Sequence, residues 1–172
     1  MDLLQELDVP AFKIASTDTS NIPLLSYIAR KARPMILSSA MATMEEVENA
    51  VAAVRDEGLE DIAVLQCTGN YPANLSDSNL RVMQTYRKKL HCIVGYSDHT
   101  PYLINPVAAT AMGAKVYEKH FTINRGWKGT DQAFSLEFAG LEKLVRDLQR
   151  ARTAMGDGIK SLTEKEKNPI FK

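Results

Sequence analysis

The chain has 172 residues, and its 21 lysines and arginines balance its 21 aspartates and glutamates. This length suits one domain whose core is large enough to fold without disulfide bonds or a structural metal. The balanced charge gives no general attraction to nucleic acid. No apolar run approaches the roughly 20 residues of a membrane helix, so we expect neither nucleic acid nor a membrane as a partner. The N-terminus also lacks the basic and apolar regions of a signal peptide.

Five short apolar runs, rich in isoleucine and valine, alternate with helical patterns along the chain. Runs this continuous are typical of strands that are buried on both faces of a parallel sheet. We expect strands over residues 11–16, 34–39, 61–67, 92–96 and 114–118.

Helical patterns fill the gaps between these runs and follow the last one. We expect helices over residues 22–31, 78–89, 104–112 and 138–155, with Leu24, Tyr27 and Ile28 inward in the first and an apolar stripe of Leu141, Leu144, Val145, Leu148 and Ala151 in the last. Thr43 and Glu46 have the spacing of a capping box that starts a further helix, and Gly58 is placed to end it.

Repeated strand–helix units predict an α/β fold with a parallel sheet. One candidate architecture is a five-stranded doubly wound sheet. The other is part of a (β/α)8 TIM barrel, which normally needs about 250 residues. The sequence has neither GxGxxG nor GxxxxGK[ST], which disfavours nucleotide binding and with it the simplest doubly wound fold.

Polar and reactive side chains gather where the expected strands end, which is where ligands bind in parallel α/β folds. They are Lys13 and Ser16, Ser38 and Ser39, Tyr71, Ser97 to His99, and Glu118 to His120. Lys13 lies between two apolar residues, so its buried ammonium needs an anionic partner. Two purely structural alternatives stay open. The Ser38–Ser39 pair could cap the next helix, and Tyr71 could pack within a loop.

His99 and His120 follow consecutive strands, whose spacing of about 4.8 Å lets residues at equal depth share a metal. Two imidazoles plus oxygen ligands suit Mn²⁺, Zn²⁺ or Fe²⁺, although structural histidines are the alternative. The connection over residues 122–135 is long and holds the only tryptophan, so we expect it to cover a ligand unless it is a packed surface excursion. Cys67 and Cys92 lie in apolar runs and predict buried free thiols, which fit a cytoplasmic protein.

Six strings, in this order and spacing, resemble the sialic acid synthases: FKIAS, PMILSSAM, LQCTGNYP, VGYSDHT, VYEKHFT and WKGTDQAFSLE. The resemblance implies a (β/α)8 barrel enzyme that condenses phosphoenolpyruvate with N-acetylmannosamine, or its 6-phosphate. The products would be N-acetylneuraminate, or its 9-phosphate, and phosphate. The resemblance also implies a divalent metal, Mn²⁺ or Mg²⁺. Related synthases make pseudaminic and legionaminic acids. Octulosonate- and heptulosonate-phosphate synthases share the chemistry, but the YSDHT and EKHFT motifs argue against them.

Carried over motif by motif, the resemblance also implies roles for single residues. His99 and His120 would be the metal ligands. The phosphate and carboxylate of phosphoenolpyruvate would be held by Lys13, Ser16, Ser38 and Ser97. A lysine and hydroxyls suit this role because they form charge-assisted hydrogen bonds with both anionic groups.

The remaining implied roles concern the amino sugar and the chemistry itself. Tyr71, Glu118 and Asp131 would face the amino sugar. Glu118 and Lys13 are the candidate catalytic residues, and Glu118 would orient either the sugar or the attacking water.

The family's barrel has eight strands, and this sequence corresponds to strands four to eight. We therefore expect a partial barrel domain over residues 1–160 and a polar tail over residues 161–172. The first three strands and the antifreeze-like domain of the family are absent, which leaves sheet edges open. Three possibilities follow: a homo-oligomer completes the barrel, another chain supplies the missing part, or the chain is an inactive subunit that binds metal and phosphoenolpyruvate.

Overall fold

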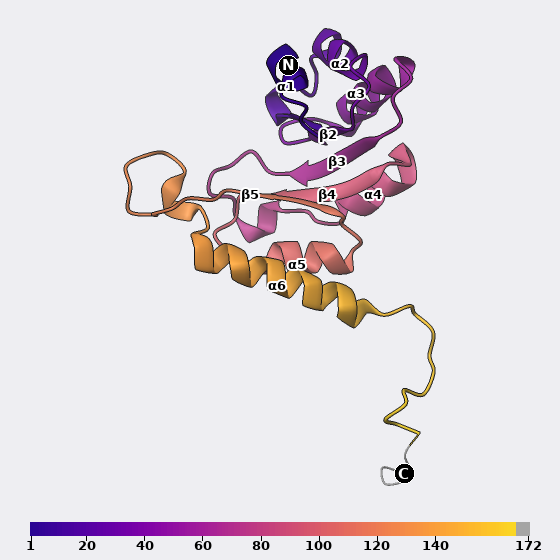
Figure 1. Cartoon of the computed structure of the whole chain (residues 1–172), viewed down its shortest axis with the longest axis vertical. Coiled ribbons are helices and arrows are strands. Elements are labelled where there is room, and N and C mark those ends of the chain that lie inside the picture. Colours follow the sequence, from indigo (N-terminus) through magenta and orange to yellow (C-terminus); the bar gives the residue numbers. More distant parts are fainter. Residues whose placement is uncertain (168–172) are drawn as a thin grey trace.

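Five parallel strands form one sheet in the computed structural model, which describes residues 1–167 (Figure 1). The strands are β1 (Phe12–Ile14), β2 (Met35–Ser38), β3 (Ile62–Cys67), β4 (Ile93–Asp98) and β5 (Val116–Lys119). Each strand pairs with the next one in the chain, and the sheet curls into part of a barrel. A doubly wound sheet would reverse its strand order at a switch point, so the predicted TIM-barrel-derived partial barrel of five strands is confirmed.

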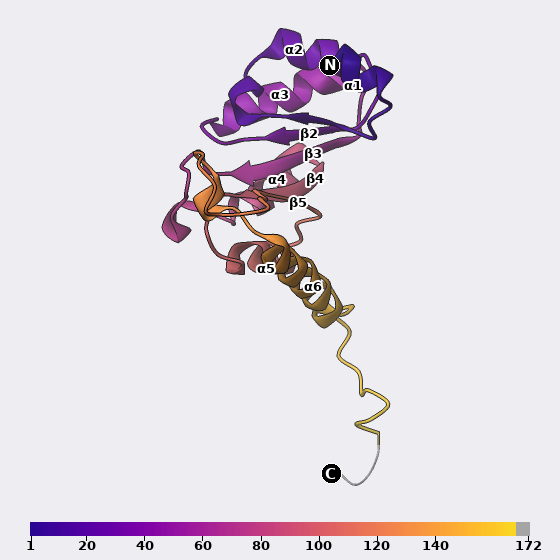
Figure 2. The same cartoon turned by 60° about the vertical axis from the view of Figure 1, so that its left-hand side comes forward.

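The helices lie along the outer face of this curled sheet (Figure 2). They are α1 (Asp2–Glu6), α2 (Ile22–Ala29), α3 (Met44–Asp56), α4 (Val82–Leu90), α5 (Ile104–Ala111) and α6 (Phe138–Met155). Helices α2 and α3 lie together beside β1 and β2, whereas α5 and α6 lie together at the other end of the sheet. In residues 1–167, no helix is both long and apolar enough to cross a membrane.

The hydrophobic core fills the space between the outer face of the sheet and the helices. Phe12 pairs in register with Met35, and Ile14 with Leu37; all four side chains are buried. Because side chains alternate along a strand, Lys13 between them points to the inner face of the curled sheet. Burying the apolar residues against the helices thus determines which side chains face the barrel interior.

Helix α3 begins and ends as the sequence predicts. The Glu46 amide donates to Thr43 Oγ1 (3.3 Å), and the Thr43 amide donates to Glu46 Oε2 (2.7 Å), so the capping box is complete. Gly58 follows the helix with a φ of 82°, a left-handed conformation that favours glycine.

Two predicted helix faces are partly wrong. In α2 the buried residues are Leu25, Ile28 and Ala29, whereas Tyr27 is exposed and donates its hydroxyl to Asp2. In α6 only Leu144 of the predicted stripe is buried, because this helix packs chiefly on α5. Leu141, Leu148 and Ala151 of the stripe are half-buried, and Val145 is exposed.

Both cysteines are free, as expected, although only Cys67 is buried and Cys92 is half-buried. The predicted polar tail falls partly outside the structure. Residues 161–167 are exposed, and residues 168–172 lie outside the described residues.

Candidate active site

A cavity of about 170 Å³ opens at the carboxyl ends of the strands. Its lining residues are Lys13, Ala15, Ser16, Ser38, Cys67, Tyr71, Ser97, His99, Glu118 and His120. Eight of them are among the nine site residues predicted from the sequence. The ninth, Asp131, lies beside the cavity with its Oδ2 atom 3.7 Å from His120 Nδ1.

The register of the sheet explains why these side chains converge. Cys67 pairs with Ser97 across β3 and β4, and Ser97 pairs with Glu118 across β4 and β5. These three residues therefore form one level of the inner face. His99 and His120 lie two residues further along, so they return to the same face one level closer to the opening.

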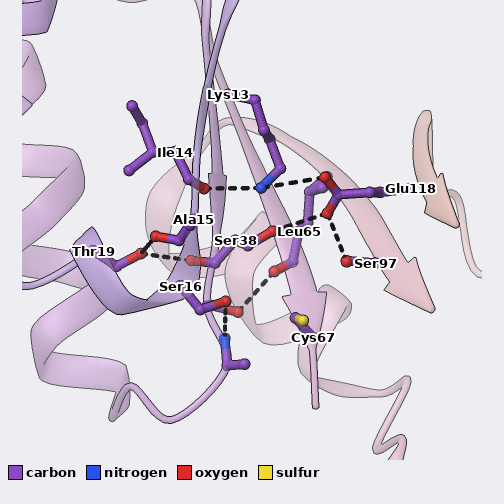
Figure 3. Close-up of polar contacts among 12 residues, drawn as sticks. Lys13, Ile14, Ala15, Ser16, Thr19, Ser38, Leu65, Cys67, Ser97 and Glu118 are labelled. Carbon is purple, nitrogen blue, oxygen red and sulfur yellow. Dashed lines mark hydrogen bonds and ion pairs between the residues drawn. The ribbon is translucent and has the colours of Figure 1, made fainter. Parts of the chain in front are cut away.

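Glu118 is the centre of the polar contacts in the cavity (Figure 3). Its Oε2 atom accepts hydrogen bonds from Ser97 Oγ (2.7 Å) and Ser38 Oγ (3.3 Å). Lys13 Nζ lies 3.4 Å from Oε1 and also donates to the Ile14 carbonyl (2.8 Å). Glu118 is thus an anionic partner for Lys13, although the ammonium is half-buried rather than buried as the sequence suggested. The Lys13 side chain is 33% exposed and the Glu118 side chain is 40% exposed, so an incoming anion can reach both.

Three aromatic rings meet above this level. The centroid of the Tyr71 ring lies 4.0 Å from that of His99 and 5.6 Å from that of His120, and the two imidazole centroids are 5.0 Å apart. Tyr71 therefore lines the cavity and packs against both imidazoles. Burial and the nearby His120 lower the pKa of His99 to about 4. His99 is consequently neutral near neutral pH, the form in which imidazole can act as a ligand.

The two imidazoles fit the donor set for a shared divalent ion. With metal–nitrogen bonds of about 2.1 Å, two rings bound side by side to one ion have centroids roughly 5 Å apart, which matches this pair. In residues 1–167, however, no group of three or more histidine, cysteine, aspartate or glutamate side chains is arranged to hold a metal. An ion here would take its other ligands from substrate oxygens or water.

The two neighbouring serines after β2 have different surroundings. Ser38 faces Glu118 in the cavity, whereas Ser39 donates to the Leu65 carbonyl (2.7 Å) and accepts from the Tyr86 hydroxyl (2.9 Å). Neither serine caps α3, because Thr43 is its N-cap. Ser38 thus lines the cavity, whereas Ser39 joins β3 and α4 through buried hydrogen bonds.

Ser16 has one visible contact at the edge of the cavity. Its hydroxyl accepts a hydrogen bond from the Ala40 amide (3.0 Å), which ties the loop after β1 to the loop after β2. The Ser16 side chain therefore still has its own proton to donate to a ligand.

The long connection after β5 borders the cavity. Phe134, in the short 3₁₀-helix Gln132–Phe134, places its ring centroid 5.1 Å from that of His120 and 6.1 Å from that of Tyr71. Asp131 precedes this turn. Only the end of the connection therefore packs against the cavity. Residues 123–130 are exposed, and Trp127, at 54% exposure, covers no part of the cavity lining, so most of the connection is a surface excursion.

Cys67 also lines the cavity, although the sequence pattern predicts only a buried thiol there. Its sulfur lies 3.6 Å from His99 Nδ1, and burial raises the pKa of the thiol. An apolar run masked its role, but strand alternation places it on the same face as Leu65, two residues earlier. Counting inward-facing positions from the strand ends would have identified it.

Known proteins are similar to this chain in both sequence and fold. The NeuB family model matches residues 1–160. The chain belongs to the NeuB family. The N-acetylneuraminate-9-phosphate synthase of Mus musculus is 41% identical over 163 residues, which cover 94% of this chain and 45% of that protein. The N,N'-diacetyllegionaminic acid synthase of Campylobacter jejuni is 40% identical over 172 residues, which cover 99% of this chain and 52% of that protein.

The structure of this NeuB-family chain matches that of a solved relative. The N-acetylneuraminic acid (sialic acid) synthetase from Leptospira borgpetersenii, crystallised in complex with citrate, superposes with a TM-score of 0.90 at 36% identity. The match covers 99% of this chain and 59% of that one. The chain spans about half the length of the curated relatives it matches.

Proposed function

We propose that this NeuB-family chain carries the substrate site of a sialic acid synthase-type transferase. The reaction is the condensation of phosphoenolpyruvate with N-acetylmannosamine or its 6-phosphate. It gives N-acetylneuraminate or its 9-phosphate, and phosphate. The observation that carries the proposal is the convergence of Lys13, Ser38 and Ser97 on Glu118, directly below the His99–His120 pair.

The lower level of the site suits phosphoenolpyruvate. Its phosphate and carboxylate are both anions, and Lys13, Ser38, Ser97 and Ser16 offer an ammonium and three hydroxyls within one small cavity. Charge-assisted hydrogen bonds from these donors would replace their present contacts with Glu118 and the backbone. Phosphoenolpyruvate would thus bind by competing with Glu118 for Lys13.

The upper level suits the amino sugar. His99 and His120 would hold Mn²⁺ or Mg²⁺, which when bound supplies Lewis-acid polarisation of the sugar aldehyde. Tyr71 and Asp131 border the same opening and would orient the sugar hydroxyls. The methylene carbon of phosphoenolpyruvate, held below, would then face the aldehyde carbon.

Attack on the sugar aldehyde leaves an alkoxide, which must take up one proton, and the water that completes the reaction has two protons to give. Water adds to the oxocarbenium carbon as its first proton is removed and delivered to the alkoxide. The second proton leaves with phosphate when the carbon–oxygen bond to phosphate breaks and the ketone forms. The Glu118 carboxylate, one level below the histidine pair, can accept the first proton of this water and pass it on. Lys13 stabilises the negative charge that develops on the departing phosphate.

The alternatives concern completeness and the sugar. Within the described residues, β1 and β5 each pair on one side only, so turnover would need further strands beside them to close the barrel. An inactive subunit that binds metal and phosphoenolpyruvate is the runner-up. A synthase for legionaminic or pseudaminic acid is the third candidate. In each case we place the protein in the cytoplasm, on the basis of its free thiols.

Phosphate release tests the proposal. The purified chain would be incubated with phosphoenolpyruvate and Mn²⁺, with N-acetylmannosamine, its 6-phosphate or the diacetamido precursor of legionaminic acid. We expect release that depends on one of these sugars and is lost in Glu118→Gln. Release that needs no sugar, or that persists in Glu118→Gln, would contradict the proposed reaction. No release from a chain that binds phosphoenolpyruvate would favour the inactive subunit.

A further inference from the structure

A buried ion pair lies directly behind the cavity, on the outer face of β4 and β5. Lys119 Nζ is 2.6 Å from Asp98 Oδ2, and the two side chains are only 6% and 0% exposed. Among the ion pairs of residues 1–167, this is the one in which both partners are buried. Neither residue lines the cavity.

Lys119 also binds the segment that follows β4. Its ammonium donates to the carbonyls of Thr100 and Tyr102, the latter at 3.3 Å. Asp98 Oδ1 in turn accepts a hydrogen bond from the Thr100 amide (3.0 Å). Together these contacts tie residues 98–102, which include His99, to β5, which leads into His120.

The neighbours of the pair are the residues of the site. Asp98 lies between Ser97 and His99, and Lys119 lies between Glu118 and His120. Ser97 is in register with Glu118, and Asp98 with Lys119. Because side chains alternate, the outward ion pair sets the relative depth of the inward residues on both strands.

We propose that Asp98 and Lys119 are positioning residues that align His99 with His120 and Ser97 with Glu118. This proposal extends the proposed function, and the effect of the alignment on catalysis rests on that function. The alignment itself, however, is a geometric property that can be measured without substrate or metal.

The energetics of buried ion pairs support a role in alignment. Removing two charges from water costs nearly as much as their attraction returns, so an apolar pair of similar volume often stabilises a fold equally well. What the apolar pair cannot supply is the directed set of hydrogen bonds from Lys119 to Asp98, Thr100 and Tyr102. Those bonds define where the segment after β4 lies.

The test is a through-space NMR contact between the rings of His99 and His120 in the metal-free chain. One variant is Lys119→Met, which keeps the length of the side chain and removes its donors. The second is Asp98→Asn with Lys119→Gln, which leaves no unpaired buried charge. Arg55→Met is the matched control, because it breaks the exposed Arg55–Glu60 pair (2.9 Å) far from the site.

We expect the His99–His120 contact to be lost in both variants and kept in Arg55→Met. The contact between His120 and Phe134 should persist in all three, because both residues lie beyond β5. We also expect Mn²⁺ to bind about tenfold or more weakly to the two variants, as for other groups that orient metal ligands.

An unchanged His99–His120 contact in either folded variant would overturn the proposal. So would the loss of cooperative unfolding in both, since the pair would then hold the whole fold. Failure of the wild-type chain to bind Mn²⁺ would count against the proposed function instead, and the ring contact would still decide the alignment.

Discussion

At the scale of single residues, Glu118 and Lys13 form the ion pair around which the polar side chains of the cavity are arranged. An isolated lysine facing the inside of a sheet would be costly to bury, and Glu118 compensates it at 3.4 Å. The same carboxylate accepts from two serines, so the donors are held in place before any anion arrives. A bound anion would have to take these donors from Glu118, so its affinity depends on how readily the carboxylate gives them up.

The neighbouring serines provide a matched pair of substitutions. Ser39→Ala would remove a buried hydroxyl that bridges Leu65 and Tyr86. We expect it to lower the free energy of unfolding by about 1–3 kcal/mol and to leave phosphoenolpyruvate affinity unchanged. Ser38→Ala should do the reverse, with weaker binding and little loss of stability. Urea denaturation and calorimetry measure the two effects, and an identical profile for both variants would refute the distinction.

The histidine pair predicts where a metal binds. We expect His99→Ala and His120→Ala each to abolish measurable Mn²⁺ binding while the chain stays folded, because each removes one of two imidazole ligands. His91→Asn is the control, since His91 is exposed and its φ of 49° suits asparagine. Titration followed by electron paramagnetic resonance reports free Mn²⁺, and unchanged affinity in both alanine variants would contradict the assignment.

At the scale of elements, strand positions followed from continuous apolar runs, and the capping box defined the start of α3. The inward face of α2 was harder to predict, because Leu24, Leu25, Tyr27 and Ile28 offer two overlapping apolar stripes. The contact of Tyr27 with Asp2 of α1 selects one of them, and such a contact between distant residues cannot be read from local spacing.

Gly95 in β4 has a packing role that the sequence does not reveal. A Cβ atom there would collide with the Val116 carbonyl and the Leu65 side chain. We expect Gly95→Ala to cost about 1–3 kcal/mol of stability, because β4 and β5 would have to separate. Thermal denaturation measures this cost, with Gly126→Ala in the exposed loop as the control. A melting temperature equal to that of the wild-type chain would show that the sheet can absorb the methyl group.

At the scale of the whole molecule, most of the candidate site was predictable because one physical rule brings it together. The carboxyl ends of parallel strands share one edge, so eight of the nine predicted residues line one cavity. The Asp98–Lys119 pair was not predicted, because local spacing does not show that β4 and β5 are in register at these residues or that residues 100–102 fold back onto Lys119. The roles assigned to the cavity residues remain predictions.

The open sheet predicts association. Strand edges that are unpaired in the described residues, together with the exposed apolar side chains of α6 (Phe138, Val145 and Met155), are surfaces to which other chains can bind. We expect light scattering to give a mass above the 19.1 kDa of one chain. A stable monomer that binds Mn²⁺ without turnover would instead favour the inactive subunit.

Calorimetric titration of phosphoenolpyruvate tests most directly whether the cavity around Glu118 binds this substrate. The titration would compare the wild-type chain with Lys13→Met and with Lys115→Met. The control removes the same charge from an exposed site at the amino end of β5. We predict binding to the wild-type chain and to Lys115→Met, and binding at least tenfold weaker to Lys13→Met. Equal affinity in all three proteins, or none in the wild type, would contradict the account.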